Sequence, residues 1–170
     1  MGNAENHGEF LALVGRHHGI VLKIAHSYQR NPADREDLAQ EILAQLWRSF
    51  PRYDRERSFS TWMYRVALNV AISHLRQTRP QPVPLDSVPD ESIPAANGKD
   101  KDQRISELDD FIQILDPLNR ALLVLYLEER SYREISEILG ISETNASTKV
   151  SRLKQRIREE LQTSLLPEQA

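Results

Sequence analysis

Five prolines between residues 80 and 94 divide this chain of 170 residues into two parts. Proline removes a backbone donor and breaks a helix interior, so this density of prolines excludes a helix there. The surrounding stretch, 80–101, is also too polar to form a packed core, and residues 80–116 hold nine acids against three bases. We therefore predict an extended, acidic linker at 80–101 between an N-terminal domain at 1–79 and a C-terminal domain at 102–170.

Both domains show the hydrophobic periodicity of helices. Apolar residues recur at intervals of three and four, aromatic residues make up only 6% of the chain, and no run favours strands. The predicted fold class is all-α, with two small helical domains joined by the proline-rich linker. Leu46, Trp47 and Ile105 are among the side chains expected to face a core. The expected helices cover 8–30, 33–50, 61–77, 105–115, 117–128, 132–139 and 143–160.

The last two expected helices form a pattern of their own. Ser131 and Glu134 make a capping box, Gly140 suits the left-handed end of a helix, and Ser142 can cap the next helix. That next helix is basic, with five Lys or Arg against one acid at 142–158, although the whole chain has a net charge of −3. Two helices joined by a tight glycine turn predict a helix-turn-helix, whose second helix enters the DNA major groove.

A second basic segment, 51–80, mixes six arginines with aromatic residues and has only two acids. Arginines can follow a nucleic-acid backbone while aromatic faces stack on unpaired bases, which favours single-stranded nucleic acid as the ligand. The alternative is that Phe59 and Trp62 are core residues and the arginines are merely solvated. For Trp62 alone we favour the core, whereas for the segment as a unit we favour nucleic-acid binding.

Three blocks of sequence occur in a defined order along the chain. They are NPADREDLAQEILAQLW, RSFSTWMYRVALNVAISHLRQ and LDPLNRALLVLYLEERSYREISEILGISETNASTKVSRLKQRI. Together with the linker, they resemble bacterial sigma factors of the extracytoplasmic-function type, the minimal sigma factors of RNA polymerase. The resemblance covers nearly the whole chain. Leu68 and Ser73 depart from it, because the family often has Arg and Asp there, and this bears on the detailed minus-ten contacts.

The resemblance implies a sigma factor that binds core RNA polymerase and directs promoter-specific initiation. It implies docking on the polymerase clamp through Asp37, Leu38, Gln40, Glu41 and Gln45. It implies melting and reading of the minus-ten element by Arg52, Tyr53, Arg57, Phe59, Ser60, Thr61, Trp62, Arg65, Asn69 and Arg76. It implies reading of duplex DNA at the minus-thirty-five element by Thr144, Asn145, Ser147, Thr148, Lys149 and Arg152. An anti-sigma factor is implied as a further partner.

The main alternative is an ordinary helix-turn-helix regulator with an N-terminal sensor or interaction domain, which would not need the 51–80 segment. A second alternative is a helical adaptor that binds only protein, which predicts no salt-dependent DNA binding.

We expect no enzymatic activity, cofactor or metal site. The sequence lacks a nucleophile triad and a glycine-rich phosphate loop, and it has no cysteines. His17, His18 and His26 lack the i, i+4 spacing of metal ligands on a helix. Without a signal peptide or a long apolar run, we expect a cytoplasmic protein with no direct membrane contact.

Overall fold

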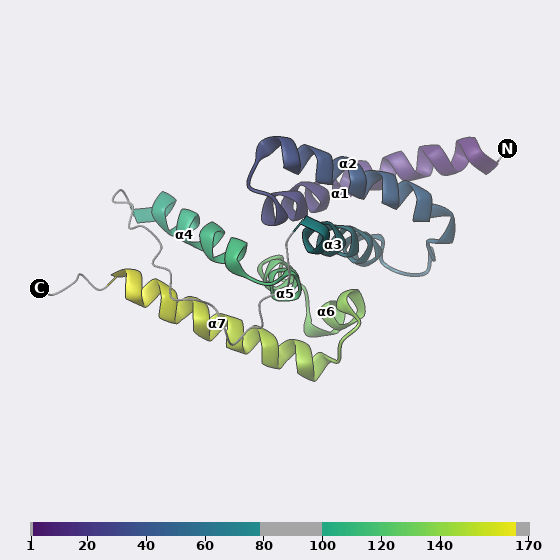
Figure 1. Ribbon diagram of the computed structural model, residues 1–170. Helices are drawn as coiled ribbons and strands as arrows, with labels where there is room; N and C mark the ends of the chain where they lie inside the picture. Colours follow the sequence, from purple (N-terminus) through teal and green to yellow (C-terminus); the bar gives the residue numbers. More distant parts are fainter. Residues whose placement is uncertain (1, 79–99, 166–170) are drawn as a thin grey trace, which may run out of the picture.

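The computed structural model describes residues 2–78 and 100–165. Figure 1 shows helices throughout these ranges, as expected for an all-α chain. They are α1 (Gly2–Tyr28), α2 (Pro32–Ser49), the short 3-10 helix η1 (Phe50–Arg52), α3 (Phe59–Thr78), α4 (Asp100–Ile114), α5 (Pro117–Leu127), α6 (Tyr132–Leu139) and α7 (Glu143–Leu165). The predicted linker falls outside the described residues, except that its last two positions already belong to α4.

Most helix starts follow from residues close by in the sequence. The Asn31 side chain accepts a hydrogen bond from the Ala33 amide at 2.9 Å at the start of α2, and Asp116 caps α5 in the same way. The start of α3 differs from prediction. The Trp62 amide donates to the Ser58 carbonyl at 3.1 Å, so this helix begins at Phe59 and Ser60 lies in its first turn.

The N-terminal domain is a packed set of α1, α2 and α3. Leu38, Ile42 and Leu46 form the buried side of α2. The prediction for Trp47 was wrong, because its side chain is 38% exposed. Its ring instead lies at the rim of the core, with its centre 5.0 Å from that of Phe10 on α1.

The C-terminal domain consists of α4 to α7 and contains the predicted helix-turn-helix. Ser131 and Glu134 form the complete capping box of α6, and Gly140 ends this helix with a φ of 68°. The buried face of α7 is formed by Ala146, Val150 and Leu153. Ile105 on α4 departs from expectation, since it is 55% exposed.

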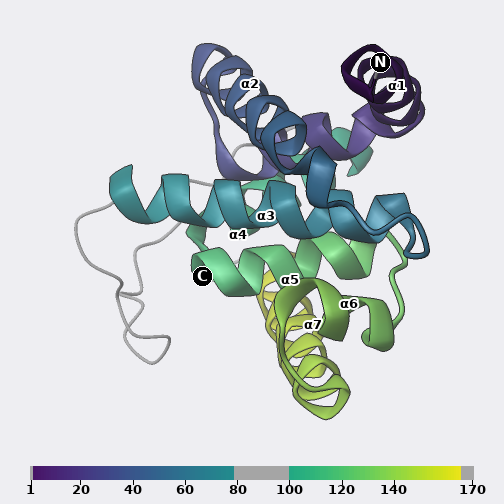
Figure 2. The same cartoon turned by 90° about the vertical axis from the view of Figure 1, so that its right-hand side faces the viewer.

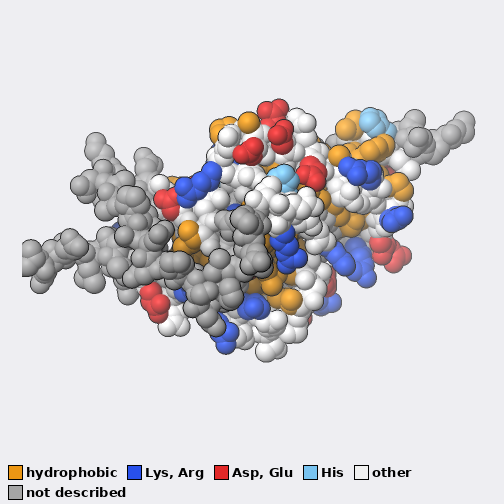
Figure 3. All heavy atoms as spheres, in the orientation of Figure 1, with side chains coloured by type: hydrophobic (Ala, Val, Ile, Leu, Met, Phe, Trp, Pro, Cys, Tyr) orange, Lys and Arg blue, Asp and Glu red, His pale blue; other side chains and the backbone are white. Residues whose placement is uncertain are grey.

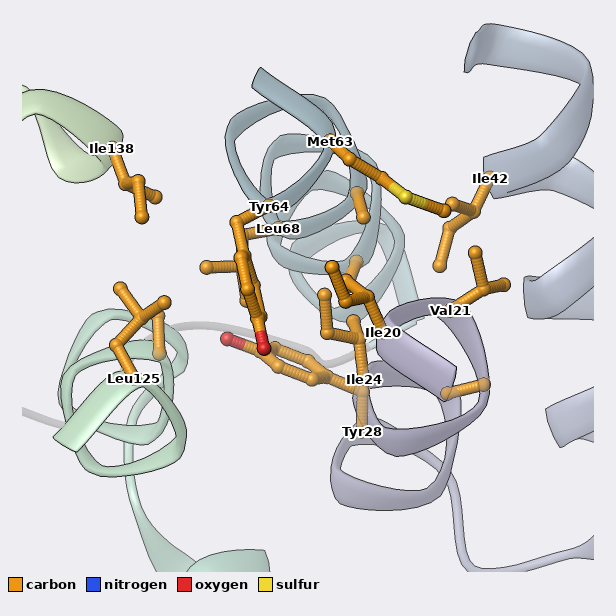
Figure 4. Close-up of a cluster of buried hydrophobic side chains, with 14 of the residues drawn as sticks. Ile20, Val21, Ile24, Tyr28, Ile42, Met63, Tyr64, Leu68, Leu125 and Ile138 are labelled. Carbon is orange, nitrogen blue, oxygen red and sulfur yellow. The ribbon is translucent and has the colours of Figure 1, made fainter. Parts of the chain in front are cut away.

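The two domains pack against each other, a point that the sequence leaves open. Figure 2 shows α3 crossing the middle of the molecule, with α2 above it and α5, α6 and α7 below. In Figure 4, Tyr64 and Leu68 of α3 lie between Ile24 of α1 and two residues of the C-terminal domain, Leu125 and Ile138. All of these side chains belong to one buried cluster, so the described helices share a single hydrophobic core.

Candidate nucleic-acid interface

The first turns of α7 present the side chains predicted to read duplex DNA. The Ser142 hydroxyl accepts a hydrogen bond from the Asn145 amide at 3.1 Å and so caps the helix. With Ala146 and Val150 turned into the core, the other face of the helix is left to solvent. Four of the predicted residues are exposed and two, Ser147 and Lys149, are half-buried; the exposed ones are Thr144, Asn145, Thr148 and Arg152.

Two cations further along α7 have partners within the domain. The Lys154 ammonium lies 5.3 Å from the centre of the Tyr126 ring on α5, and the Arg156 guanidinium lies 5.5 Å from that of Phe111 on α4. Cations over aromatic faces are attracted by the ring quadrupole. Lys154 and Arg156 therefore pack within the domain, whereas Arg152 is exposed to solvent.

The loop before α3 is held by an aromatic cluster. The Tyr53 hydroxyl donates to the Arg57 carbonyl at 2.6 Å, and its ring centre lies 5.4 Å from that of Phe59 and 5.0 Å from that of Trp62. Burial, reinforced by the nearby Asp54 carboxylate, raises the pKa of Tyr53.

The structure places Tyr53 and Phe59 in the core, because the loop folds back over α1 and α3. These two predicted minus-ten residues are therefore not available at the surface. The sequence left open whether Trp62 is a core residue or a surface residue. Its side chain is half-buried, which is intermediate between the two.

The remaining predicted minus-ten residues are exposed or half-buried. Ser60 and Thr61 are half-buried in the first turn of α3, and Arg52 and Arg57 are exposed beside it. Further along α3, the exposed side chains are Arg65, Asn69 and Arg76. Their spacing of four and seven residues keeps them on one side of the helix. Arg57 also lies 3.6 Å from Asp54 in its own loop.

The predicted polymerase-docking residues lie on α2, away from the helix-turn-helix (Figure 2). Asp37, Gln40 and Glu41 are exposed and Gln45 is half-buried. Leu38 is completely buried, so it positions this helix and cannot touch a partner. The Glu41 carboxylate lies 3.1 Å from His74 Nδ1 of α3. Figure 3 shows acidic side chains gathered over α2 at the top of the molecule.

Sequence reasoning missed Arg130, which follows α5. Its Nη1 atom donates to the Ser60 hydroxyl at 3.4 Å, and its guanidinium lies 4.9 Å from the centre of the Tyr64 ring. This arginine therefore touches a predicted minus-ten residue from the other domain. The 70 positions between Arg130 and Ser60 explain why no local sequence pattern marks the pair.

The three histidines considered as metal ligands have different neighbours. His18 lies against the Gly15 carbonyl at 2.9 Å, His17 beside the Phe59 ring, and His26 3.6 Å from Asp109. Within the described ranges, no group of three or more His, Cys, Asp or Glu is arranged to hold a metal ion. In the same part of the chain, no helix combines the length and apolar character needed to cross a membrane.

Comparison with known proteins matches both domains. The family model for Sigma-70 region 2 matches residues 13–81, and the model for Sigma-70, region 4 matches residues 105–157. The ECF RNA polymerase sigma factor SigW of Bacillus subtilis is 26% identical, over 89% of this chain and 88% of its own length. The RNA polymerase sigma-E factor of Streptomyces coelicolor is 27% identical, over 90% of this chain and 86% of its own.

A solved structure shares the fold. CnrH, in complex with the cytosolic domain of CnrY, superposes with a TM-score of 0.65 and 20% identity, over 91% of this chain and 88% of that chain. The two sigma regions occur in the expected order, and the relatives align over most of the chain. The protein therefore belongs to the extracytoplasmic-function sigma factors, which direct transcription initiation by RNA polymerase.

Proposed function

We propose that this sigma factor reads promoter DNA with two separate surfaces. The start of α7 reads duplex DNA at the minus-thirty-five element, with Asn145 at base edges and Arg152 on a phosphate. The α3 surface, defined as Arg52, Arg57, Ser60, Thr61, Trp62, Arg65, Asn69 and Arg76, binds the melted strand at the minus-ten element. Tyr53 and Phe59 support this surface from beneath.

The observation that carries the proposal is the stripe of Arg65, Asn69 and Arg76 along α3, next to the half-buried ring of Trp62. Cations beside an accessible aromatic ring suit a strand whose bases have lost their stacking partners. A base removed from a duplex costs a few kcal/mol of unstacking, so a receiving surface of this kind is required. A regulator that binds only duplex DNA has no use for it.

Docking on core polymerase is assigned to the exposed side of α2. Asp37, Gln40 and Glu41 offer carboxylates and an amide on a helix that is anchored by buried Leu38 and Ile42. Such a polar, acidic surface suits a protein partner and repels DNA. RNA synthesis then belongs to the polymerase, and this chain acts without catalysis.

An anti-sigma factor is the second protein partner that we propose. CnrH, which shares the fold, was solved with a protein domain bound. In this chain, Ile105, Leu108, Leu127 and Ile157 line an apolar groove between α4, α5 and α7. Arg104, Lys154 and Arg158 stand beside the groove, so an amphipathic helix with acidic residues suits it by charge and by apolar contact.

The experiment that tests the proposed function is run-off transcription with the purified chain, core RNA polymerase and genomic DNA fragments. We expect discrete start sites that disappear without the chain. No transcripts, combined with salt-sensitive binding to duplex DNA alone, would favour the ordinary helix-turn-helix regulator.

A double variant separates the melted-strand role from the other roles. Arg65→Ala with Asn69→Ala should retain polymerase binding and lose open-complex formation, measured by permanganate reactivity of unpaired thymines. Arg16→Ala is the control, because Arg16 is an exposed arginine of α1 with no assigned role. Normal melting by the double variant would contradict the role of α3.

A further inference from the structure

The turn between α5 and α6, residues 128–131, contacts both α1 and α3 of the opposite domain. The Glu128 carboxylate accepts hydrogen bonds from the Lys23 ammonium at 2.6 Å and from the Tyr64 hydroxyl at 3.2 Å. Charged hydrogen bonds of this kind are stronger than neutral ones. Glu128 thereby joins Lys23, which lies 105 positions before it, and Tyr64, which lies 64 positions before it.

Arg130 provides the second half of this contact. Its guanidinium covers the face of the Tyr64 ring and donates to the Ser60 hydroxyl. The same Nη1 atom also lies 3.3 Å from the Glu134 carboxylate of α6. Because Glu134 also completes the capping box of α6, the start of the helix-turn-helix is tied to the start of α3.

The backbone of the turn is held in a defined shape. The Arg130 amide donates to the Leu125 carbonyl and the Glu129 amide to the Tyr126 carbonyl, both at 3.0 Å. Glu129 has a φ of 56°, and among the non-glycine residues that the structure describes it alone has a positive φ. A left-handed residue here costs roughly 1 kcal/mol, and it directs the two flanking side chains onto the N-terminal domain.

This closed arrangement is too short to engage a promoter. The names minus-ten and minus-thirty-five place the two elements about 25 base pairs apart, which is roughly 85 Å of duplex at about 3.4 Å a step. A compact chain of 170 residues has a radius of gyration of about 15 Å. The start of the helix-turn-helix and the start of α3 are in contact through Arg130, so the domains must separate before both elements are read.

We propose that the 128–131 turn is an intramolecular latch that keeps the sigma factor closed until polymerase and promoter engage it. The latch holds the helix-turn-helix against Ser60, at one end of the α3 surface. What its release accomplishes rests on the function proposed above, whereas the closure itself is independent of that function.

The closure is tested on the chain alone by thiol labelling. The chain has no cysteine, so Leu68→Cys introduces one reporter. Leu68 is 1% exposed and lies on the side of α3 toward α5 (Figure 4). The labelling rate of a buried thiol is proportional to the population of the open form. In this background, Arg130→Ala should accelerate labelling about tenfold, as expected for losing hydrogen bonds to a charged group.

Two controls separate release of the latch from general destabilisation. Arg133→Ala removes the same charge from an exposed arginine whose ion pair, with Glu137, lies within α6, and it should leave the rate unchanged. Ile42→Cys places the reporter inside the N-terminal domain, opposite Met63 (Figure 4), and Arg130→Ala should not accelerate its labelling. Equal rates in the Arg130 and Arg133 variants, or equal acceleration of both reporters, would overturn the latch.

The need for opening is tested by locking. In Lys23→Cys with Glu128→Cys, a short cleavable bis-maleimide joins two positions whose native side chains touch. We expect the linked protein to lose run-off transcription and cleavage of the linker to restore it, while a mono-maleimide has no effect. A linked protein that transcribes normally would overturn the proposal. Absence of transcripts from every version would refute the proposed function, and the thiol rates would still decide the latch.

Discussion

At the scale of single residues, Arg120 joins the two domains through its guanidinium. Its side chain is completely buried. It donates to the Ser27 carbonyl at 3.2 Å, the Gln113 carbonyl at 2.6 Å and the Leu115 carbonyl at 3.1 Å, near the ends of α1 and α4. Carbonyls at a helix end have no partner within the helix. One guanidinium thus satisfies helix ends from both domains.

Replacing Arg120 should therefore be costly. Arg120→Met keeps an unbranched stem but removes the donor to the Gln113 and Leu115 carbonyls, and we expect a loss of about 3 kcal/mol in the free energy of unfolding. Urea denaturation followed by circular dichroism measures it. Arg133→Ala, at an exposed site, should change this free energy by less than about 0.5 kcal/mol. A similar small change for Arg120→Met would show that water replaces the guanidinium.

Tyr64 gives the chain a specific alkaline sensitivity. Burial and, next, the Glu128 carboxylate raise the pKa of Tyr64 to about 12. The folded-state pKa of Tyr64 exceeds the ordinary tyrosine value near 10. The contribution of the neutral Tyr64 hydroxyl to stability is therefore fully present below about pH 10 and disappears as pH rises through about 12. The difference in unfolding free energy between the parent protein and Tyr64→Phe should shrink across this window. Urea midpoints of both proteins at several pH values measure it, and a constant difference would contradict it.

At the scale of elements, α6 has both of its ends determined by local chemistry. The Ser131 hydroxyl accepts from the Glu134 amide, and the Glu134 carboxylate accepts from the Ser131 amide at 2.9 Å. These hydrogen bonds, foremost the one from the Ser131 backbone, lower the pKa of Glu134. At the other end, Gly140 adopts a left-handed conformation that other residues adopt only at a cost.

Gly140→Ala should destabilise the protein by roughly 1 kcal/mol. An added Cβ would meet no atom within 4 Å, so the cost comes from the backbone alone. Gly15→Ala is the matched control, because Gly15 lies within α1 and also has open space around its Cβ position. There, alanine should stabilise by about 0.5–1 kcal/mol. Thermal unfolding of both variants should show shifts of opposite sign, and two shifts of the same sign would refute the argument.

Substitutions at the start of α7 should cause two kinds of DNA-binding defect. Asn145→Ala should change the preferred minus-thirty-five sequence, because an amide can read a base edge. Arg152→Ala should weaken binding to all sequences similarly and lower the salt dependence by about one counterion, as expected for a phosphate contact. Selection from a randomised duplex library, with the chain bound to polymerase, measures the sequence preference, and binding titrations at several salt concentrations measure the salt dependence. Interchanged outcomes would reverse the assigned roles.

At the scale of the whole molecule, the shared core should make the domains unfold together. Both tryptophans, Trp47 and Trp62, belong to the N-terminal domain, whereas far-ultraviolet circular dichroism reports all helices. We expect urea curves from fluorescence and from circular dichroism to coincide. Separate midpoints would show that the contact between the domains contributes little to stability.

The sequence determined those features that depend on near neighbours. The boundaries marked by Asn31, Asp116, Ser131 and Gly140 follow from it, because capping involves groups within about four positions. The solvent-facing side of α7 also follows from the sequence, because the buried residues Ala146, Val150 and Leu153 recur with the helical period. The start of α3 was misplaced because Ser58 and Ser60 offer the same capping chemistry two positions apart.

The tertiary structure decided what depends on distant contacts. It placed Tyr53 and Phe59 in the core and Trp47 at its rim. Helical periodicity cannot predict this, because Tyr53 lies in a loop and Phe59 is the first residue of α3. The tertiary structure also brought Arg120 to Ser27 and Arg130 to Ser60, across 93 and 70 positions. Such pairs form only when whole helices pack, so the burial of an arginine and the closure of the two domains are properties of the assembled core and not of any local stretch of chain.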